Sequence, residues 1–373
     1  MANCNLLMLG KSGIGKSSLL NYMLGEPVAA VGIGRPVTGG GDKGPSLHRY
    51  QPLRTSAIDI TIYDSWGMEA DKADQWKSII EAEISKRADT SKVSSWFHAA
   101  IYCVSVERAR IEDFEFDEII KPLIKSGVNV LFALTKADMD RIEGEESICV
   151  QLEKLIKQQC PKNVGIYKIC SEVKQKRSGK VEPFGKEDLI AGLMNAVQVG
   201  LGERVALYSG RQFGKTMKSW KESVLLEYDK GPGFWEFLPA HMERVVEFAD
   251  SQFNERMGRF NYWLIDALDT AARIYQGLGI SISRNYTKLR AELGQGAGVN
   301  EKLTWKFDDS FTHYALSGIP LLNVLYVIFK KEMHRDNLSE QLDQIVSESI
   351  GRFEKLMPDI LKQLDQVMLG YDG

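Results

Sequence analysis

Short apolar runs alternate with segments of helical periodicity over the first half of the chain. Asn5–Leu9 and Val128–Leu134 are largely apolar runs typical of buried strands, whereas Ile58–Tyr63 alternates apolar and polar residues. The predicted strands are Asn5–Leu9, Ile58–Tyr63, Ala99–Val106, Val128–Leu134 and Val164–Ile169. The predicted helices are Ser17–Leu24, Asp74–Arg87, Ile111–Lys125 and Lys186–Val199. This alternation predicts an α/β fold for the first half.

Strand signals fade after Val199, and the second half has a helical pattern. Apolar residues recur at three- and four-residue steps from Met242 to Ala271 and again from Leu338 to Val367. We expect these stripes to form the core of an all-α bundle rather than a coiled coil with a partner, because the heptads are imperfect. The pattern predicts two domains, residues 1–200 and 201–373, with the boundary at Gly200–Leu201–Gly202.

The segment between the first strand and the first helix, Gly10–Ser17, has the sequence GKSGIGKS and fits G-x-x-x-x-G-K-[ST] without a mismatch. Glycines let the backbone curl, so the N–H groups of Gly13, Ile14 and Gly15 can face a polyphosphate at the positive end of a helix dipole. The segment therefore predicts a phosphate-binding loop that includes Lys16, Ser17 and Ser18. The Lys16 ammonium would reach the β- and γ-phosphates, and the Ser17 hydroxyl would bind Mg²⁺.

Two further segments follow the phosphate loop at positions suited to the γ-phosphate. Glu26–Pro45 is rich in glycine and contains Thr38, whose hydroxyl we expect to close on Mg²⁺ and the γ-phosphate. The strand ending at Tyr63 continues into Asp64-Ser65-Trp66-Gly67, which is D-x-x-G. Asp64 can hold a water molecule on Mg²⁺, and the Gly67 N–H can approach the γ-phosphate because no side chain obstructs it.

The strand Val128–Leu134 leads into Thr135-Lys136-Ala137-Asp138. A carboxylate at Asp138 can accept hydrogen bonds from N1–H and the 2-amino group of guanine, whereas adenine offers no such pair of donors. Lys136 would lie along the base. The next predicted strand is followed by Cys170-Ser171-Glu172, and we expect a backbone N–H near Ser171 to bind guanine O6.

In order along the chain, the phosphate loop, the loop threonine, D-x-x-G, [NT]-K-x-D and the final serine loop are similar to the five motifs of the P-loop GTPase superfamily. Within it, the chain resembles septin-related, immunity-related and bacterial Era/HSR1-type GTPases over about residues 4 to 199. The resemblance implies a doubly wound, mostly parallel α/β fold with GTP or GDP and Mg²⁺ at the carboxyl ends of the strands. It also implies an enzyme that hydrolyses GTP.

The chain departs from this pattern at three positions. Thr135 replaces the commoner asparagine, as it does in immunity-related members. Met68 stands where Ras-type enzymes carry the glutamine that orients the attacking water, so we expect slow hydrolysis. Gly13 replaces the asparagine of potassium-activated relatives, which disfavours a potassium mechanism.

Arg35 lies three residues before Thr38, the spacing of the internal arginine finger in G-protein α-subunits. The alternative is that Arg35 is simply solvated.

Charge and cysteine content narrow the function further. The net charge of −3 over 373 residues gives no general attraction to nucleic acid or anionic lipid. The five cysteines lack metal-binding or disulfide spacing, and several lie in apolar runs. Because the first strand begins almost at Met1, we expect no signal peptide and a cytoplasmic protein.

Two functions remain open. The first is a GTPase switch in which GTP orders Glu26–Pro45 and Gly67–Ala73, and these act on the helical domain. The second is a dynamin-like membrane GTPase that works by nucleotide-dependent oligomerisation, with the nearly uncharged stretch Ala315–Phe329 dipping into lipid. That stretch is shorter than the about 20 residues of a bilayer span, so a buried bundle helix is the favoured interpretation. We also expect a protein partner or self-association through the nucleotide face.

Overall fold

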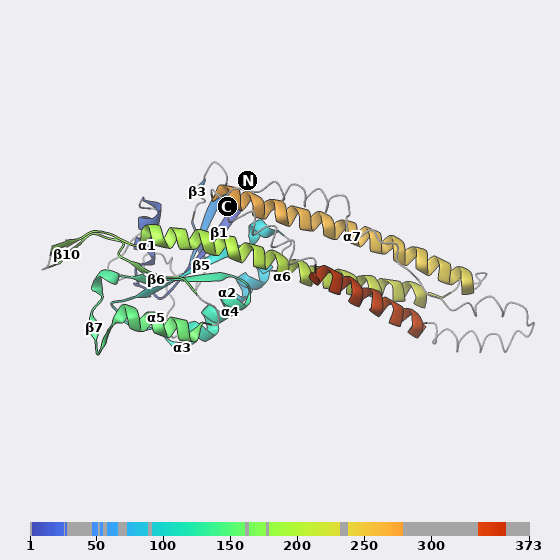
Figure 1. The fold of residues 1–373 in the computed structure, drawn as a ribbon, viewed down its shortest axis with the longest axis horizontal. Helices are drawn as coiled ribbons and strands as arrows, with labels where there is room; N and C mark the ends of the chain where they lie inside the picture. Colours follow the sequence, from blue (N-terminus) through green and yellow to red (C-terminus); the bar gives the residue numbers. More distant parts are fainter. Residues whose placement is uncertain are drawn as a thin grey trace, which may run out of the picture. The chain divides into compact units, whose positions relative to one another are not determined.

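The computed structural model describes most of the chain's first 278 residues and one later segment. The described residues are 2–25, 27, 47–50, 53–54, 58–65, 73–88, 92–160, 164–176, 179–231, 238–278 and 335–355. They belong to two compact units, one made of Met1–Arg204 and Asp269–Ile282 and the other of Val205–Leu268 and Ser283–Gly373. Figure 1 shows the elements along the chain.

The first unit is built around a seven-stranded sheet in the order β2-β4-β1-β5-β6-β9, with β3 also paired to β4. Its strands are β1 (Ala2–Leu9), β2 (Leu47–Arg49), β3 (Leu53–Arg54), β4 (Ile58–Ser65), β5 (Phe97–Ser105), β6 (Asn129–Thr135) and β9 (Ile166–Ile169). Strands β1, β4, β5, β6 and β9 are parallel, and β2 and β3 run antiparallel to β4. The predicted mostly parallel sheet is confirmed. The strand order reverses at β1, the position where sheets of this type bind ligands.

Helices cover both faces of this sheet. They are α1 (Lys16–Leu24), α2 (Ala73–Ala88), α3 (Asp113–Glu115), the π-helical turn η3 (Phe116–Ile120), α4 (Lys121–Lys125), α5 (Ile148–Gln159) and the beginning of α6 (Lys186–Asp229). The short 3₁₀ turns are η2 (Val93–Ser95) and η4 (Ala137–Met139), and two small hairpins are formed by β7 (Ile142–Glu143) with β8 (Glu146–Ser147) and by β10 (Lys174–Lys176) with β11 (Gly179–Val181). The predicted helix Ile111–Lys125 is therefore present as α3, η3 and α4.

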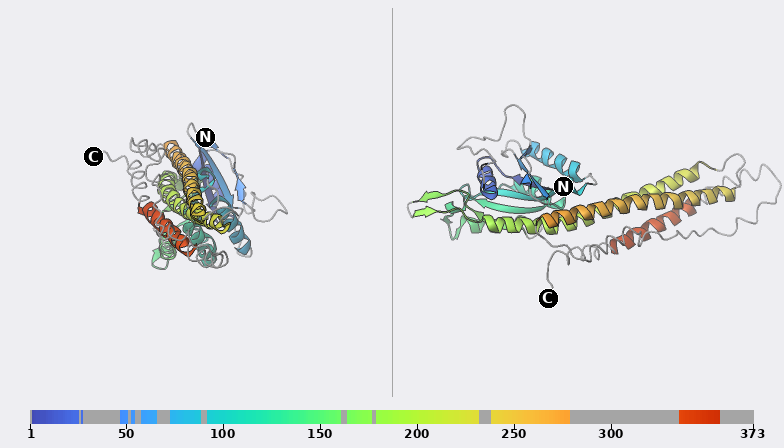
Figure 2. Two further views of the ribbon diagram at one scale, coloured as in Figure 1. Left: turned by 90° about the vertical axis from the view of Figure 1, so that its right-hand side faces the viewer. Right: turned by 90° about the horizontal axis from the view of Figure 1, so that it is seen from above.

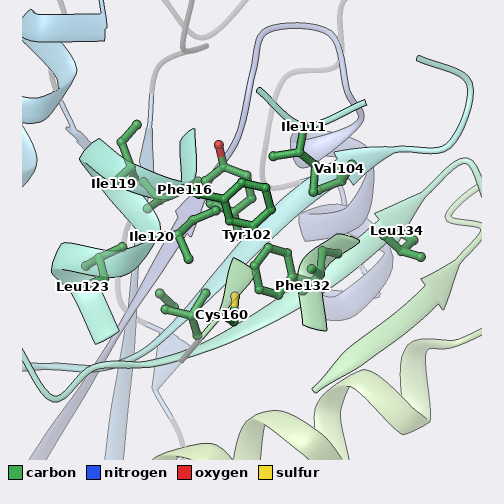
Figure 3. Close-up of a cluster of buried hydrophobic side chains, with 14 of the residues drawn as sticks. Tyr102, Val104, Ile111, Phe116, Ile119, Ile120, Leu123, Phe132, Leu134 and Cys160 are labelled. Carbon is green, nitrogen blue, oxygen red and sulfur yellow. The ribbon is translucent and has the colours of Figure 1, made fainter. Parts of the chain in front are cut away.

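A large hydrophobic core joins one face of the sheet to α2, α3, η3, α4 and α5. Figure 3 shows Tyr102 and Phe132 from neighbouring strands facing Phe116, Ile120 and other side chains from the helical segments. The Tyr102 and Phe132 rings lie 5.8 Å apart between centroids. Burial of large apolar side chains such as these supplies the main favourable term in folding.

The beginning of α6 packs beside β5 and β6, as the right-hand view of Figure 2 shows. Asn129 on β6 donates a hydrogen bond from Nδ2 to the Ala196 carbonyl at 2.9 Å, and Arg204 Nη1 lies 2.5 Å from the Phe97 carbonyl on β5. The predicted end of this helix near Val199 is wrong, because α6 continues to Asp229. A glycine inside a helix costs only about 1 kcal/mol. Gly200 is needed at this point, since a Cβ there would lie 2.8 Å from the Asn129 amide nitrogen.

The described part of the second unit is helical, as predicted. It contains most of α6, most of α7 (Leu238–Gly277) and a helix at residues 335–355. Trp220 donates a hydrogen bond to the Ala249 carbonyl at 2.9 Å, and the Phe213 and Phe353 rings stack with their centroids 4.5 Å apart. These contacts join the three helices in one core.

Two expectations about the second half are not tested by the structure. Its division into a separate domain after residue 200 stays a prediction. The stretch Ala315–Phe329 lies outside the described residues. Among the helices that are described, none is long and apolar enough to cross a membrane.

Candidate functional site

The loop between β1 and α1 has the backbone shape that its glycines predict. Gly10, Gly13 and Gly15 have φ values of +139°, +71° and +101°, a region that residues with a side chain seldom occupy. Gly10 also passes close to β5, because a Cβ there would lie 2.6 Å from the Cys103 carbonyl oxygen. The loop leads into the N-terminus of α1, where backbone N–H groups and the helix dipole favour an anion.

Lys16 begins α1 and folds back over this loop. Its Nζ donates hydrogen bonds to the carbonyl oxygens of Gly10 at 2.9 Å and Lys11 at 3.0 Å. Burial lowers the pKa of Lys16, and the negative charge of Asp64 acts against that shift. The ammonium group is therefore held at the centre of the loop, next to a carboxylate.

Asp64 lies near the carboxyl end of β4, beside Met8 of β1. It is almost fully buried, and burial raises its pKa to about 6, although the Lys16 charge opposes the shift. Within the described part of the chain, Asp64 Oδ1 is buried without a hydrogen-bond partner. The Tyr50 hydroxyl lies beside this carboxylate and, like the Lys16 charge, opposes the rise of its pKa. A buried carboxylate oxygen and the half-buried hydroxyl of Ser17 on α1 are the kind of oxygen ligands that Mg²⁺ prefers.

No cluster of three or more His, Cys, Asp or Glu side chains suited to a metal exists among the described residues.

The loop after β6 is joined directly to the phosphate loop by Thr135. Its hydroxyl oxygen lies 2.5 Å from the Ile14 carbonyl oxygen and 3.1 Å from that of Val104. Lys136 has a left-handed backbone with φ +54°, and Asp138 follows in η4, half-buried. This turn aims the loop after β6 along the same edge of the sheet as the phosphate loop.

The loop after β9 completes this edge. Burial raises the pKa of the Cys170 thiol, and the nearby Asp138 carboxylate adds to the shift. Glu172 accepts hydrogen bonds from Ser18 on α1 at 2.7 Å and from Lys174 at 2.6 Å. Ser171 lies between Cys170 and Glu172 and is half-buried. Loops from β1, β6 and β9 thus meet at the carboxyl ends of parallel strands.

Sequence reasoning missed the contribution of the loop after β5. Glu107 Oε2 lies 2.5 Å from Lys136 Nζ, and a Cβ on Gly13 would lie 3.2 Å from Arg108 Nη2. A signal was present, because a charged run follows a buried strand at the edge where such sheets bind ligands.

Lys11 of the phosphate loop is held by two glutamates at the N-terminus of α3, the helix that follows β5. Its Nζ lies 3.0 Å from a carboxylate oxygen of Glu112 and 3.0 Å from one of Glu115. Glu115 is buried and also accepts a hydrogen bond from the Tyr102 hydroxyl at 2.7 Å. The phosphate loop is therefore anchored to the hydrophobic core through a polar network.

The structure places most of the predicted site residues along one edge of the sheet. These are Gly13, Ile14, Gly15, Lys16, Ser17, Ser18, Asp64, Thr135, Lys136, Asp138 and Ser171. Thr38, Gly67 and Arg35 lie outside the described residues, as does Met68. The individual roles assigned to all of these residues stay predictions.

A mostly parallel sheet of this order, with a glycine-rich loop between its central strand and α1, is the architecture expected from the resemblance to P-loop GTPases. No protein-family model and no curated protein matches the sequence.

Solved structures of P-loop GTPases do resemble it. Toc33 from Arabidopsis thaliana in complex with GDP and Mg²⁺ is 18% identical, with a TM-score of 0.37 over 53% of this chain and 85% of that one. A variant of Era from Aquifex aeolicus bound to GDP and AlF₄⁻ is 19% identical, with a TM-score of 0.32 over 51% and 55% of the two chains. A probable GTP-binding protein, engB, is 14% identical, with a TM-score of 0.33 over 52% and 98%. The likeness is one of fold.

Proposed function

We propose that this chain binds GTP and GDP with Mg²⁺ and hydrolyses GTP to GDP and phosphate. The observation that carries the proposal is the hydrogen bond from Thr135 to the Ile14 carbonyl at 2.5 Å. It joins the loop that bears Asp138 to the loop that bears Lys16, so a base and a polyphosphate of one nucleotide can be bound together. Toc33, whose solved structure has a similar fold, was determined in complex with GDP and Mg²⁺.

The base is selected by Asp138, whose carboxylate can accept two hydrogen bonds from guanine. Lys136 would lie along the base, where its ion pair with Glu107 limits its freedom. The phosphates would lie over Gly13–Ser18, with the Lys16 ammonium supplying positive charge. Bound Mg²⁺ would be held by Ser17 and Asp64 and would neutralise charge on the phosphates.

Hydrolysis is expected to be slow, because Met68 cannot orient a water molecule as glutamine does. Thr38 and Gly67 keep the roles that the sequence predicts at the γ-phosphate, and Arg35 is either an internal arginine finger or a solvated loop residue.

Phosphate release from GTP and ATP by the full chain with Mg²⁺ tests the reaction. GTP should be hydrolysed and ATP much more slowly; Lys16→Ala should abolish both activities, because it removes charge from the phosphates. Asp138→Asn should lose activity on GTP and gain activity on xanthosine triphosphate, which lacks the 2-amino donor. Asp117→Asn, on an exposed carboxylate paired with Lys121, is the matched control and should behave as wild type. Equal rates with GTP and ATP would contradict the proposal.

We further propose that exchange of GTP for GDP changes the conformation of the second, helical unit. Support comes from chain continuity, since α6 and α7 each contribute residues to both units. Hydrogen exchange in residues 238–268 should then differ between the GDP-bound chain and the chain bound to a non-hydrolysable GTP analogue. Identical hydrogen exchange in the two nucleotide states would contradict the proposed conformational change but not the proposed hydrolysis of GTP.

A further inference from the structure

Arg108 lies against the phosphate loop, although it belongs to the loop after β5. Its Nη2 is 3.2 Å from the position that a Cβ on Gly13 would occupy. Gly13 is exposed, and its φ of +71° is a left-handed value that glycine adopts without strain. The missing side chain at Gly13 leaves the space in which the guanidinium group lies.

Among the described residues, Arg108 differs from its cationic neighbours in forming no ion pair, although its charge helps to lower the pKa of Glu107. Lys11 is paired with Glu112 and Glu115, Lys136 with Glu107, and Arg110 with Glu112. Within the described part of the chain, the exposed Arg108 side chain forms neither a hydrogen bond nor an ion pair. It also contributes, after burial, to lowering the pKa of Lys16. Two positive side chains, Lys16 on α1 and Arg108 in the loop after β5, thus converge on the phosphate loop.

Such convergence is unfavourable unless an anion lies between the charges. A guanidinium group is planar and can donate two parallel hydrogen bonds to phosphate oxygens. From its place beside Gly13, the Arg108 side chain is within reach of a polyphosphate bound on the loop.

We propose that Arg108 is a phosphate-binding residue of the nucleotide site, contacting the polyphosphate of the nucleotide bound by the same chain. The inference rests on the proposed function, and it adds to the nucleotide site a residue that belongs to none of the sequence motifs. Arg108 would share the phosphate charge with Lys16, so both GDP and GTP would be bound through it.

Equilibrium binding of GDP and GTP to the full chain with Mg²⁺ tests this assignment. Arg108→Ala should weaken the binding of both GDP and GTP by about tenfold or more, which is the effect of losing a charge-assisted hydrogen bond. It should also make binding less sensitive to salt, because one cation–phosphate attraction is lost. Arg108→Lys should retain part of the affinity, since a lysine keeps the charge but not the planar pair of donors.

Arg141→Ala is the matched control, because Arg141 is exposed in the same unit and pairs only weakly with Glu143, at 3.4 Å. Its affinity for both nucleotides should be that of wild type. Thermal unfolding without nucleotide should be the same for Arg108→Ala and Arg141→Ala, which separates a binding role from a structural one.

Affinities of Arg108→Ala within twofold of wild type for both nucleotides would overturn the inference and leave the proposed function intact. A nucleotide-free Arg108→Ala chain that unfolds well below Arg141→Ala would also overturn it, by assigning Arg108 a structural role. A wild-type chain that binds no guanine nucleotide would instead refute the proposed function.

Discussion

Several ionisable side chains of the first unit are buried, and each is held by a different local interaction. Lys16 and Asp64 share one buried region near the phosphate loop. His98 lies on β5, where its Nδ1 accepts a hydrogen bond from the Asn5 N–H at 2.9 Å. Burial, followed by the positive charge of Arg204, lowers the pKa of His98 to about 3. The imidazole is therefore neutral in the folded protein at any ordinary pH.

His98 should make stability depend on pH. The unfolded chain binds a proton at His98 below about pH 6.5, whereas the folded chain does not until about pH 3. Its contribution to stability is thus complete above pH 6.5 and falls as the pH drops, by about 1.4 kcal/mol per pH unit. The raised pKa of Asp64 acts in the opposite direction below about pH 6, so the wild-type profile alone does not isolate His98.

Urea unfolding of wild type and His98→Gln at several pH values separates the two effects. The free energy of unfolding of His98→Gln relative to wild type should rise as the pH falls from 6.5 to 4.5. A difference between the two proteins that stays constant over this range would show that His98 is protonated in the folded state or exposed.

At the residue scale, a candidate site residue can be recognised from the sequence when it lies in a local motif. Gly10, Lys16 and Asp138 are recognisable because the backbone shape or the chemistry requires that residue type at that spacing. Glu107 and Arg108 carry no such pattern. Their partners, Lys136 and Gly13, are distant in sequence and are brought close only by the order of the strands.

At the element scale, the pattern of apolar residues predicts all five parallel strands, because β1, β4, β5 and β6 are largely buried and the less buried β9 still has apolar residues at both ends. The antiparallel strands β2 and β3 were missed; they have only three and two residues, too few to establish a period. The same is true of the β7–β8 and β10–β11 hairpins.

The length of α6 could not be predicted, because its glycines suggest a helix end in the sequence but some of them are required by close packing against the sheet. Gly192 faces Tyr167, since a Cβ would lie 1.9 Å from the tyrosine hydroxyl, and Gly200 faces Asn129. In the sequence, Gly200 and Gly202 resemble a helix end. In the structure they lie inside a helix of 44 residues.

At the scale of the whole molecule, the alternation of elements predicts the fold class. It does not predict that a later segment of the chain returns to the first unit. Residues Asp269–Ile282 belong to the first unit although they are separated from it in sequence. Tyr275 at the end of α7 donates a hydrogen bond to the Gln198 carbonyl on α6 at 2.8 Å. Periodicity identifies the apolar face of α7 but not which element packs against each part of it.

The central claim is that one edge of the sheet binds a guanine nucleotide, with the phosphates on the loop after β1 and the base on the loop after β6. Calorimetric titration of the full chain with GDP and with ADP, both with Mg²⁺, tests it most directly. The two ligands share their diphosphate and ribose, so any difference in affinity comes from the base. We predict one GDP bound per chain and ADP at least ~100-fold weaker, because adenine would leave the Asp138 carboxylate without its donors. Equal affinities for GDP and ADP, or no binding of either, would contradict the account.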